Sequence, residues 1–169
     1  YIEFKDKKKF ILMYDDTRRN EENYDEDGDG SKPGIKIYFG NYEIRNGNYV
    51  LKTSSSAGVW FENVMAVTKK KINHYSDGVF ELEKYMLETH GRNSELNIFI
   101  TRKGQYILGY SNGEEISYDK NRNYYLLYNK SDIKKLPSSV EEFRKQFKMD
   151  KKAEQERLAE EARLTGQSQ

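Results

Sequence analysis

Apolar and polar residues alternate along two stretches of the chain, residues 35–54 and 96–128. A period of two matches the two faces of a β-strand, so each stretch is predicted to contain strands with one apolar face. An Asn-Gly pair interrupts each stretch, at Asn46-Gly47 and at residues 112–113. This pair favours tight hairpin turns because both residues tolerate positive φ. Both stretches are therefore predicted to form antiparallel hairpins.

Residues 77–90 show the spacing of a helix instead. Val79, Leu82 and Met86 recur every three or four positions, which places them on one helical face. Ser76, directly before Asp77, suits an N-cap. We predict that this helix lays its apolar face on the sheet.

A second, longer helix is predicted over residues 139–164. Ser138 and Glu141 have the spacing of a capping box, and an apolar stripe follows for two turns before it stops at Phe147. Residues 150–169 are strongly charged. We expect the first half of the helix to dock on the domain and residues 150–169 to project as a charged helix with a frayed tail.

Two segments fit neither pattern well. Residues 57–72 are compatible with a strand and with a helix, and their β-branched and aromatic content favours a strand. Residues 15–34 are acidic, glycine-containing and almost without apolar residues, so we expect a mobile loop there. The predicted fold is α+β: a single domain over residues 1–149 with a tyrosine-rich, mainly antiparallel sheet.

The composition predicts a thin core. Of the 169 residues 36% are hydrophobic and 34% are charged, while 14 tyrosines and 8 phenylalanines provide large areas for burial. The net charge of +1 disfavours a dedicated nucleic-acid-binding protein, which usually has a basic excess. The chain has no cysteine and no apolar run of the roughly 20 residues that a transmembrane helix needs. It begins at Tyr1, so we expect a processed or shortened form of a longer protein.

One motif suggests a metal. Asp25, Asp27 and Asp29 alternate within a glycine-containing segment, which resembles the first half of a calcium loop of the EF-hand type. Lys36 stands where the bidentate glutamate of that loop belongs. The three aspartates are therefore candidate Ca²⁺ ligands, with an acidic turn as the alternative interpretation.

No pattern of residues predicts catalysis. His74 lies near Ser76 and Asp77, but catalytic triads are assembled by the fold and not by sequence neighbours. The glycine-rich phosphate-binding and dinucleotide-binding motifs are missing, as is the nucleophile elbow of hydrolases. A noncatalytic role is expected.

Tyrosines are the strongest candidates for a binding surface. Those of the predicted sheet fall on both faces, so some lie opposite the core; Tyr106, Tyr110 and Tyr124 are the candidates for contacts with a ligand or partner. The alternative interpretation is that these tyrosines bind nothing and only cover a sheet face that is partly exposed to solvent. On the projecting helix, Leu158 and Ala162 form a short apolar stripe suited to a partner helix.

Two hypotheses about function follow. The first is a noncatalytic protein-interaction or assembly module of a larger complex, which binds a protein partner or assembles with itself. The second is a secreted or cell-surface domain whose exposed tyrosines bind carbohydrate or a similar ligand, with Ca²⁺ at the acidic segment.

Overall fold

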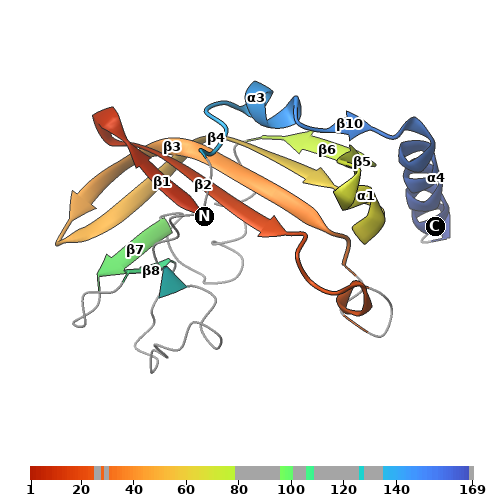
Figure 1. The fold of residues 1–169 in the computed structure, drawn as a ribbon, viewed down its shortest axis with the longest axis horizontal. Coiled ribbons are helices and arrows are strands. Elements are labelled where there is room, and N and C mark those ends of the chain that lie inside the picture. The colour runs from red at the N-terminus through yellow and green to blue at the C-terminus, as the bar shows by residue number, and fades with distance from the viewer. Residues whose placement is uncertain are drawn as a thin grey trace.

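The computed structural model describes residues 1–24, 28, 31–78, 96–100, 106–108, 126–127 and 135–167 (Figure 1). In chain order the elements are β1 (Ile2–Lys5), the 3₁₀-helix η1 (Asp6–Lys8), β2 (Lys9–Asp16), the 3₁₀-helix η2 (Glu21–Asn23), β3 (Gly34–Arg45), β4 (Asn48–Trp60), α1 (Val64–Thr68), β5 (Lys71–Ile72), β6 (His74–Asp77), β7 (Leu96–Ile100), β8 (Tyr106–Leu108), β9 (Leu126–Leu127), α3 (Val140–Arg144), β10 (Lys148–Met149) and α4 (Lys151–Gln167).

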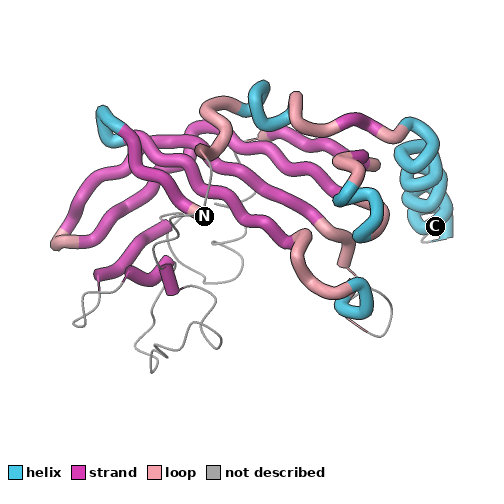
Figure 2. The backbone as a smooth tube through the Cα atoms, in the orientation of Figure 1, coloured by secondary structure: helices cyan, strands magenta, loops and turns pink. Residues whose placement is uncertain are grey.

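The predicted α+β fold with an antiparallel sheet is confirmed. Among the described residues, eight strands form one sheet in the order β1-β2-β3-β4-β7-β8-β9, with β6 also paired to β4. All of these pairs are antiparallel. A separate parallel pair joins β5 to β10. The long strands β2, β3 and β4 form the centre of the molecule (Figure 2).

The first predicted hairpin is present and longer than expected. β3 and β4 pair from Arg45 and Asn48 at the turn to Gly34 and Trp60 at the far end. At the turn Asn46 has φ 53° and Gly47 has φ 79°, the positive values that an Asn-Gly hairpin requires. In the second region β7, β8 and β9 pair consecutively. The Asn-Gly turn at 112–113 lies outside the described residues.

A β-bulge divides the β3–β4 hairpin into two halves. Phe39 pairs with Ser55 and Gly40 with Thr53, so Ser54 is the extra residue. A Cβ on Gly40 would stand 1.9 Å from the carbonyl oxygen of Lys52, a separation that no side chain tolerates. One extra residue shifts every later side chain of β4 to the opposite face. The glycine thus allows the apolar residues to change faces along the hairpin.

The two faces of the sheet have different cores. On one, which we call the covered face, segments from α1, α3 and β10 pack over the strands, and α3 and β10 lie above them in the view of Figure 1. Its buried residues are mainly aliphatic: Ile11, Ile37, Ala57, Val59, Phe61, Ile72, Leu136 and Phe143. The guanidinium of Arg144 also lies 4.1 Å from the centre of the Tyr75 ring, which attaches α3 to β6.

The opposite face, the open face, has a smaller buried core. It consists of Phe10, Leu12, Tyr38 and Leu51. Half-buried tyrosines of β2, β3 and β4 surround these residues, together with Leu127 of β9. In the view of Figure 1, β7 and β8 lie below the long strands.

The segment 57–72 does not continue as a strand to its end. β4 ends at Trp60, and Asn63 caps the short helix α1 by accepting a hydrogen bond from the Ala66 backbone N–H at 2.9 Å. The prediction of a strand therefore holds only for the first residues and for the short strand β5.

The predicted start of the helix over residues 77–90 needs a correction. Ser76 and Asp77 belong to β6, where they pair with Gly58 and Ala57 of β4. Pairing with β4 provides hydrogen-bond partners for the backbone N–H and C=O groups of this segment, so they do not depend on a helix cap. Residues 79–95 lie outside the described residues.

The predicted continuous helix over 139–164 is two helices. α3 ends at Arg144, β10 pairs with β5, and α4 begins at Lys151. The cap is shifted by one residue: Ser139 accepts the N–H of Glu142 at 3.1 Å, and the Glu142 carboxylate accepts from Ser138. The break has a physical cause, because the backbone N–H of Asp150 binds the Ile72 carbonyl oxygen at 2.8 Å.

Candidate interaction surface on the open face

Four aromatic residues from four strands meet on the open face, and we call them the aromatic cluster: Phe4, Tyr42, Tyr49 and Tyr106. Their strands are β1, β3, β4 and β8. Strand register brings them together, since Tyr42 pairs with Leu51 and Phe4 pairs with Phe10 of the same core. The cluster is thus a continuation of the open-face core toward the end of the β3–β4 hairpin.

The rings of the aromatic cluster contact one another directly. Phe4 and Tyr49 are stacked with centroids 4.6 Å apart. Tyr42 meets Phe4 edge-on at 5.0 Å and Tyr49 at 5.5 Å. Tyr106 lies beside Tyr49 at 6.3 Å with a tilted ring. Such edge and stacked pairs are the arrangements that aromatic rings prefer, and they hold the side chains in place.

The outer members of this surface are open to solvent. Phe4 is 37% exposed and Tyr106 is 40% exposed, whereas Phe10, beside them in the core, is 1% exposed. Ile44 pairs with Tyr49 at the hairpin end and is 59% exposed. The apolar surface therefore continues from the buried core to solvent, an arrangement typical of a contact site.

Charged side chains occupy the other face of the same hairpin end. The carboxylate of Glu43 accepts a hydrogen bond from Arg45, and Lys52 lies 4.0 Å away. The hydrogen bond from Arg45 and the two positive charges hold the pKa of Glu43 below its ordinary value. The hairpin end is thus apolar on the open face and charged on the other.

The sequence identified only part of this surface. Tyr106 belongs to the aromatic cluster and is exposed, and its contact with a ligand or partner stays a prediction. Tyr110 and Tyr124 fall outside the described residues. Phe4 and Ile44 were missed as site residues. The alternation of Ile2 and Phe4 with charged residues was a signal for a further edge strand.

The second predicted contact lies on α4, which stands at one end of the sheet (Figure 1). The Asp150 carboxylate accepts the Ala153 N–H at 3.2 Å, and Arg157 Nε donates to the Asn73 carbonyl oxygen at 3.1 Å. Every described residue after Arg157 is exposed, up to Gly166. Leu158, at 49% exposure, and Ala162 therefore contact solvent.

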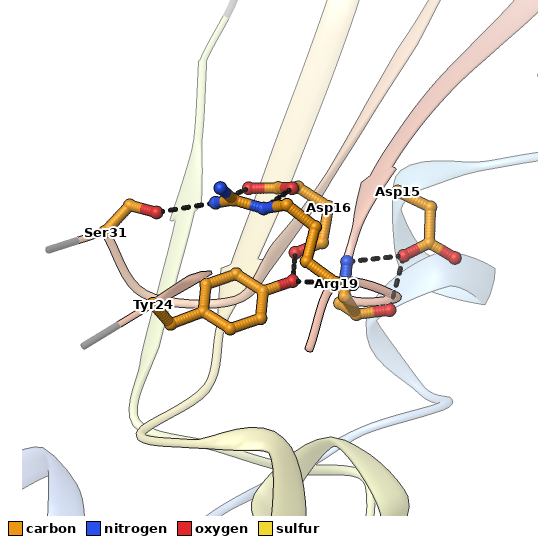
Figure 3. A network of polar contacts seen from close by, with 6 residues as sticks. Asp15, Asp16, Arg19, Tyr24 and Ser31 are labelled. Atoms are coloured by element: carbon orange, nitrogen blue, oxygen red, sulfur yellow. Dashed lines mark hydrogen bonds and ion pairs between the residues drawn. The ribbon is translucent and has the colours of Figure 1, made fainter. Parts of the chain in front are cut away.

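A polar network orders the start of the acidic segment (Figure 3). Tyr24 is 8% exposed, and its hydroxyl donates to the Asp16 carbonyl oxygen at 2.6 Å. Arg19 binds the Asp16 carboxylate at 2.9 Å and donates to the Ser31 hydroxyl at 2.8 Å. The guanidinium also lies over the Tyr24 ring, 4.4 Å from its centre. These contacts give the described part of the 15–34 segment a defined conformation.

The candidate calcium ligands cannot be placed, because Asp25, Asp27 and Asp29 lie outside the described residues. Within the residues that are described, no group of three histidine, cysteine, aspartate or glutamate side chains could hold a metal ion. His74 stacks on Trp60 with ring centroids 4.9 Å apart. This contact gives His74 a packing role in β6.

Comparisons with protein-family models, with curated proteins and with solved structures found no match to the chain. In the part of the chain that the structure describes, no helix has the length and apolar character needed to cross a membrane.

Proposed function

We propose that this chain is a noncatalytic interaction module that binds a protein partner through the open face and acts as part of a larger complex. The observation that carries this proposal is the contact of the four rings of the aromatic cluster, with Phe4, Tyr106 and the adjacent Ile44 exposed.

Several properties of this surface favour protein binding. Tyrosine and phenylalanine are enriched at the centres of protein interfaces, where a few buried aromatic anchors dominate the affinity. The rings are held by one another, so little side-chain freedom is lost when a partner covers them. The surface also continues directly into a packed core, which gives the anchors a rigid support.

The ring geometry favours a protein over a carbohydrate. A sugar ring stacks on an accessible aromatic face, but Phe4 and Tyr49 each cover a face of the other at 4.6 Å. Tyr42 presents its ring edge-on to both. The surface is thus a set of ring edges with an isoleucine beside them, and these suit the aliphatic and aromatic side chains of a protein partner.

α4 offers a second contact to the same complex. Leu158 and Leu164 are 49% and 53% exposed on a helix whose described residues from Leu158 to Gly166 are all exposed. Glu160 and Arg163, bound to each other, keep the surrounding surface polar. A narrow apolar stripe within a charged helix suits a shallow helix–helix contact.

The test begins with the protein purified under native conditions. Its solution mass is measured over a dilution series, and any stoichiometric protein that remains bound is identified. That partner, or the chain itself if it self-associates, is then titrated against three forms: wild type, Phe4→Ser/Tyr106→Ser, and Met65→Ser. Met65 is 66% exposed on α1 and serves as the matched apolar control.

We expect the double variant to lose binding by about a hundredfold, because truncated aromatic anchors typically cost about 2 kcal/mol or more. Met65→Ser should bind like wild type. Equal binding by all three forms contradicts the proposal, as does a monomer that retains no protein. Binding of purified glycans that Tyr106→Ser removes would replace the protein partner with a carbohydrate.

A further inference from the structure

The turn between β1 and β2 is a strained, lysine-rich structure. Lys5 pairs with Lys9 across the hairpin, and the residues between them include Lys7 and Lys8. Lys7 has φ 59° and Lys8 has φ 56°, so two successive lysines adopt the left-handed conformation. Residues with a Cβ rarely adopt it, and such strain occurs preferentially at functional sites. The turn therefore places four lysines within five residues of the chain.

Within the described residues these lysines make no direct contact with a carboxylate, although the charges of Lys5 and Lys135 help to lower the pKa of Glu142. Among the described residues, Lys5, Lys7 and Lys9 form no ion pair, and neither does Lys135, which precedes α3. Lys5 is also partly removed from solvent. Like charges repel each other when they gather in this way, and a bound anion would relieve that repulsion.

Two adjoining hollows lie beside the turn. The first, of about 570 Å³, is lined by Lys5, Lys7, Lys9 and Lys135, with Glu3, Phe4 and Asp6. The second, of about 520 Å³, shares Lys5 and Lys9 and extends to the bulge of β4 and the start of α3. Both hollows are open to solvent, so a ligand bound there would lie at the surface of the protein.

The second hollow also offers hydroxyl groups. Ser55 lines it and makes no hydrogen bond through its side chain within the described structure. Ser139 lines it as well, and its oxygen accepts the Glu142 N–H at 3.1 Å, so its own hydrogen remains to be donated. The Glu142 carboxylate accepts a hydrogen bond from Ser138. Glu141 is the carboxylate residue that lines the second hollow.

We propose that these joined hollows bind a small anion that carries phosphate groups. Lys5 and Lys9 line both hollows, and Ser55 and Ser139 add neutral donors to the second hollow. Phosphate oxygens accept hydrogen bonds from both kinds of donor, and charge-assisted bonds to lysine are the stronger ones. The first hollow borders Phe4 of the aromatic cluster, but the proposed donors Lys5, Lys9, Ser55 and Ser139 lie outside that cluster and do not depend on the proposed protein partner.

The probe for the test is inorganic pyrophosphate, titrated into the full chain at constant ionic strength and followed by NMR chemical shifts. Lys5→Gln/Lys9→Gln removes the two shared charges, and Ser55→Ala removes a donor whose side chain makes no hydrogen bond within the described structure. The control is Lys151→Gln/Lys152→Gln, which removes the same charge from α4. Unfolding curves of each variant establish that it is folded.

We expect saturable binding with shifts at the turn and at the start of α3. Lys5→Gln/Lys9→Gln should weaken it by at least about tenfold, Ser55→Ala should weaken it less, and the α4 control should leave it unchanged. Glu141→Gln should tighten it, because a repelling charge is removed. The proposal fails if pyrophosphate does not bind at millimolar concentration, or if the turn and α4 variants weaken it equally.

Discussion

The covered and open faces belong to the same strands but are completed in different ways. On the covered face the chain folds over its own strands, and Ile37, Val59 and Phe143 are at most 1% exposed. On the open face burial ends at a row of aromatic rings, and Phe4 and Tyr106 keep more than a third of their surface in solvent. The first face is mainly aliphatic around Phe61 and Phe143, whereas the second has half-buried tyrosines around a small core of Phe10, Leu12, Tyr38 and Leu51.

This difference separates the residues that stabilise the fold from those available to a partner. Aliphatic side chains gain most from complete burial, whereas tyrosine tolerates a boundary between an apolar core and water. A chain with only 36% hydrophobic residues can therefore complete one core and leave the second face partly open. The predictions below test this division of roles, beginning with the largest effect.

Phe143→Ala should damage the covered face most. The ring is 1% exposed and lies 5.2 Å from Phe147, so its removal leaves a cavity between α3 and the sheet. We expect the free energy of unfolding to fall by about 3–5 kcal/mol, measured by urea denaturation. Tyr106→Ala on the open face should lower it by about 1 kcal/mol or less. Similar losses at the two positions would show that both faces are equally part of the core.

Gly40→Ala tests the place where the apolar residues change faces. A methyl group there would meet the Lys52 carbonyl oxygen at 1.9 Å and the Phe10 ring at 2.9 Å, so the bulge must move. We expect a loss of about 2–4 kcal/mol in the free energy of unfolding and altered NMR shifts in both halves of the hairpin. The exposed Gly166, with open space around its Cα, is the control, and its change to Ala should be neutral or slightly stabilising. An equally stable Gly40→Ala would contradict the role of the bulge.

Local patterns predicted much of the sheet. The Asn46-Gly47 turn and the strands on either side of it were visible because they depend on neighbours in sequence. The ion pair between Glu160 and Arg163 likewise joins two neighbours in sequence, three positions apart on α4. Arg157 pairs with Glu161 on the same helix and also binds the carbonyl oxygen of Asn73, a residue distant in sequence.

The errors arose where distant residues decide the structure. Ser76 and Asp77 have good capping chemistry, yet pairing with β4 places them in a strand. The break before α4 depends on the contact of β10 with β5, which no local spacing encodes. Asp150 was an available signal, since an aspartate before a run of helix-forming residues can cap a new helix. Likewise, the aromatic cluster needs four strands in register.

Lys8→Gly tests the strain in the lysine-rich turn. At φ 56° a glycine avoids the Cβ clash of lysine, so we expect the free energy of unfolding to rise by about 0.5–1 kcal/mol. Lys9→Gly is the matched control: Lys9 has φ −98°, and glycine there should destabilise the strand by about 0.5–1 kcal/mol. Both are measured by urea denaturation. Stabilisation by Lys9→Gly but not by Lys8→Gly would contradict the presence of strain at Lys8.

The smallest expected effect concerns the cap of α3. Hydrogen bonds from Ser138 to the carboxylate of Glu142 lower the pKa of that group below its ordinary value of 4.5. A lowered pKa in the folded state means that the ionised carboxylate stabilises the fold above pH 4.5, and that this contribution is lost as the pH falls through the lowered pKa. An NMR titration of Glu142 should give a midpoint below 4.5, and Ser138→Ala should raise it toward that value. An unchanged midpoint in Ser138→Ala would assign the shift to another cause.

Hydroxyl-radical footprinting compares the open face most directly in the free chain and in the complex isolated under native conditions. If the aromatic cluster is the contact surface, labelling of Phe4 and Tyr106 will fall sharply in the complex, while the exposed Met65 on α1 will be labelled as in the free chain. Equal labelling of Phe4 and Tyr106 in both states would contradict a partner on the open face.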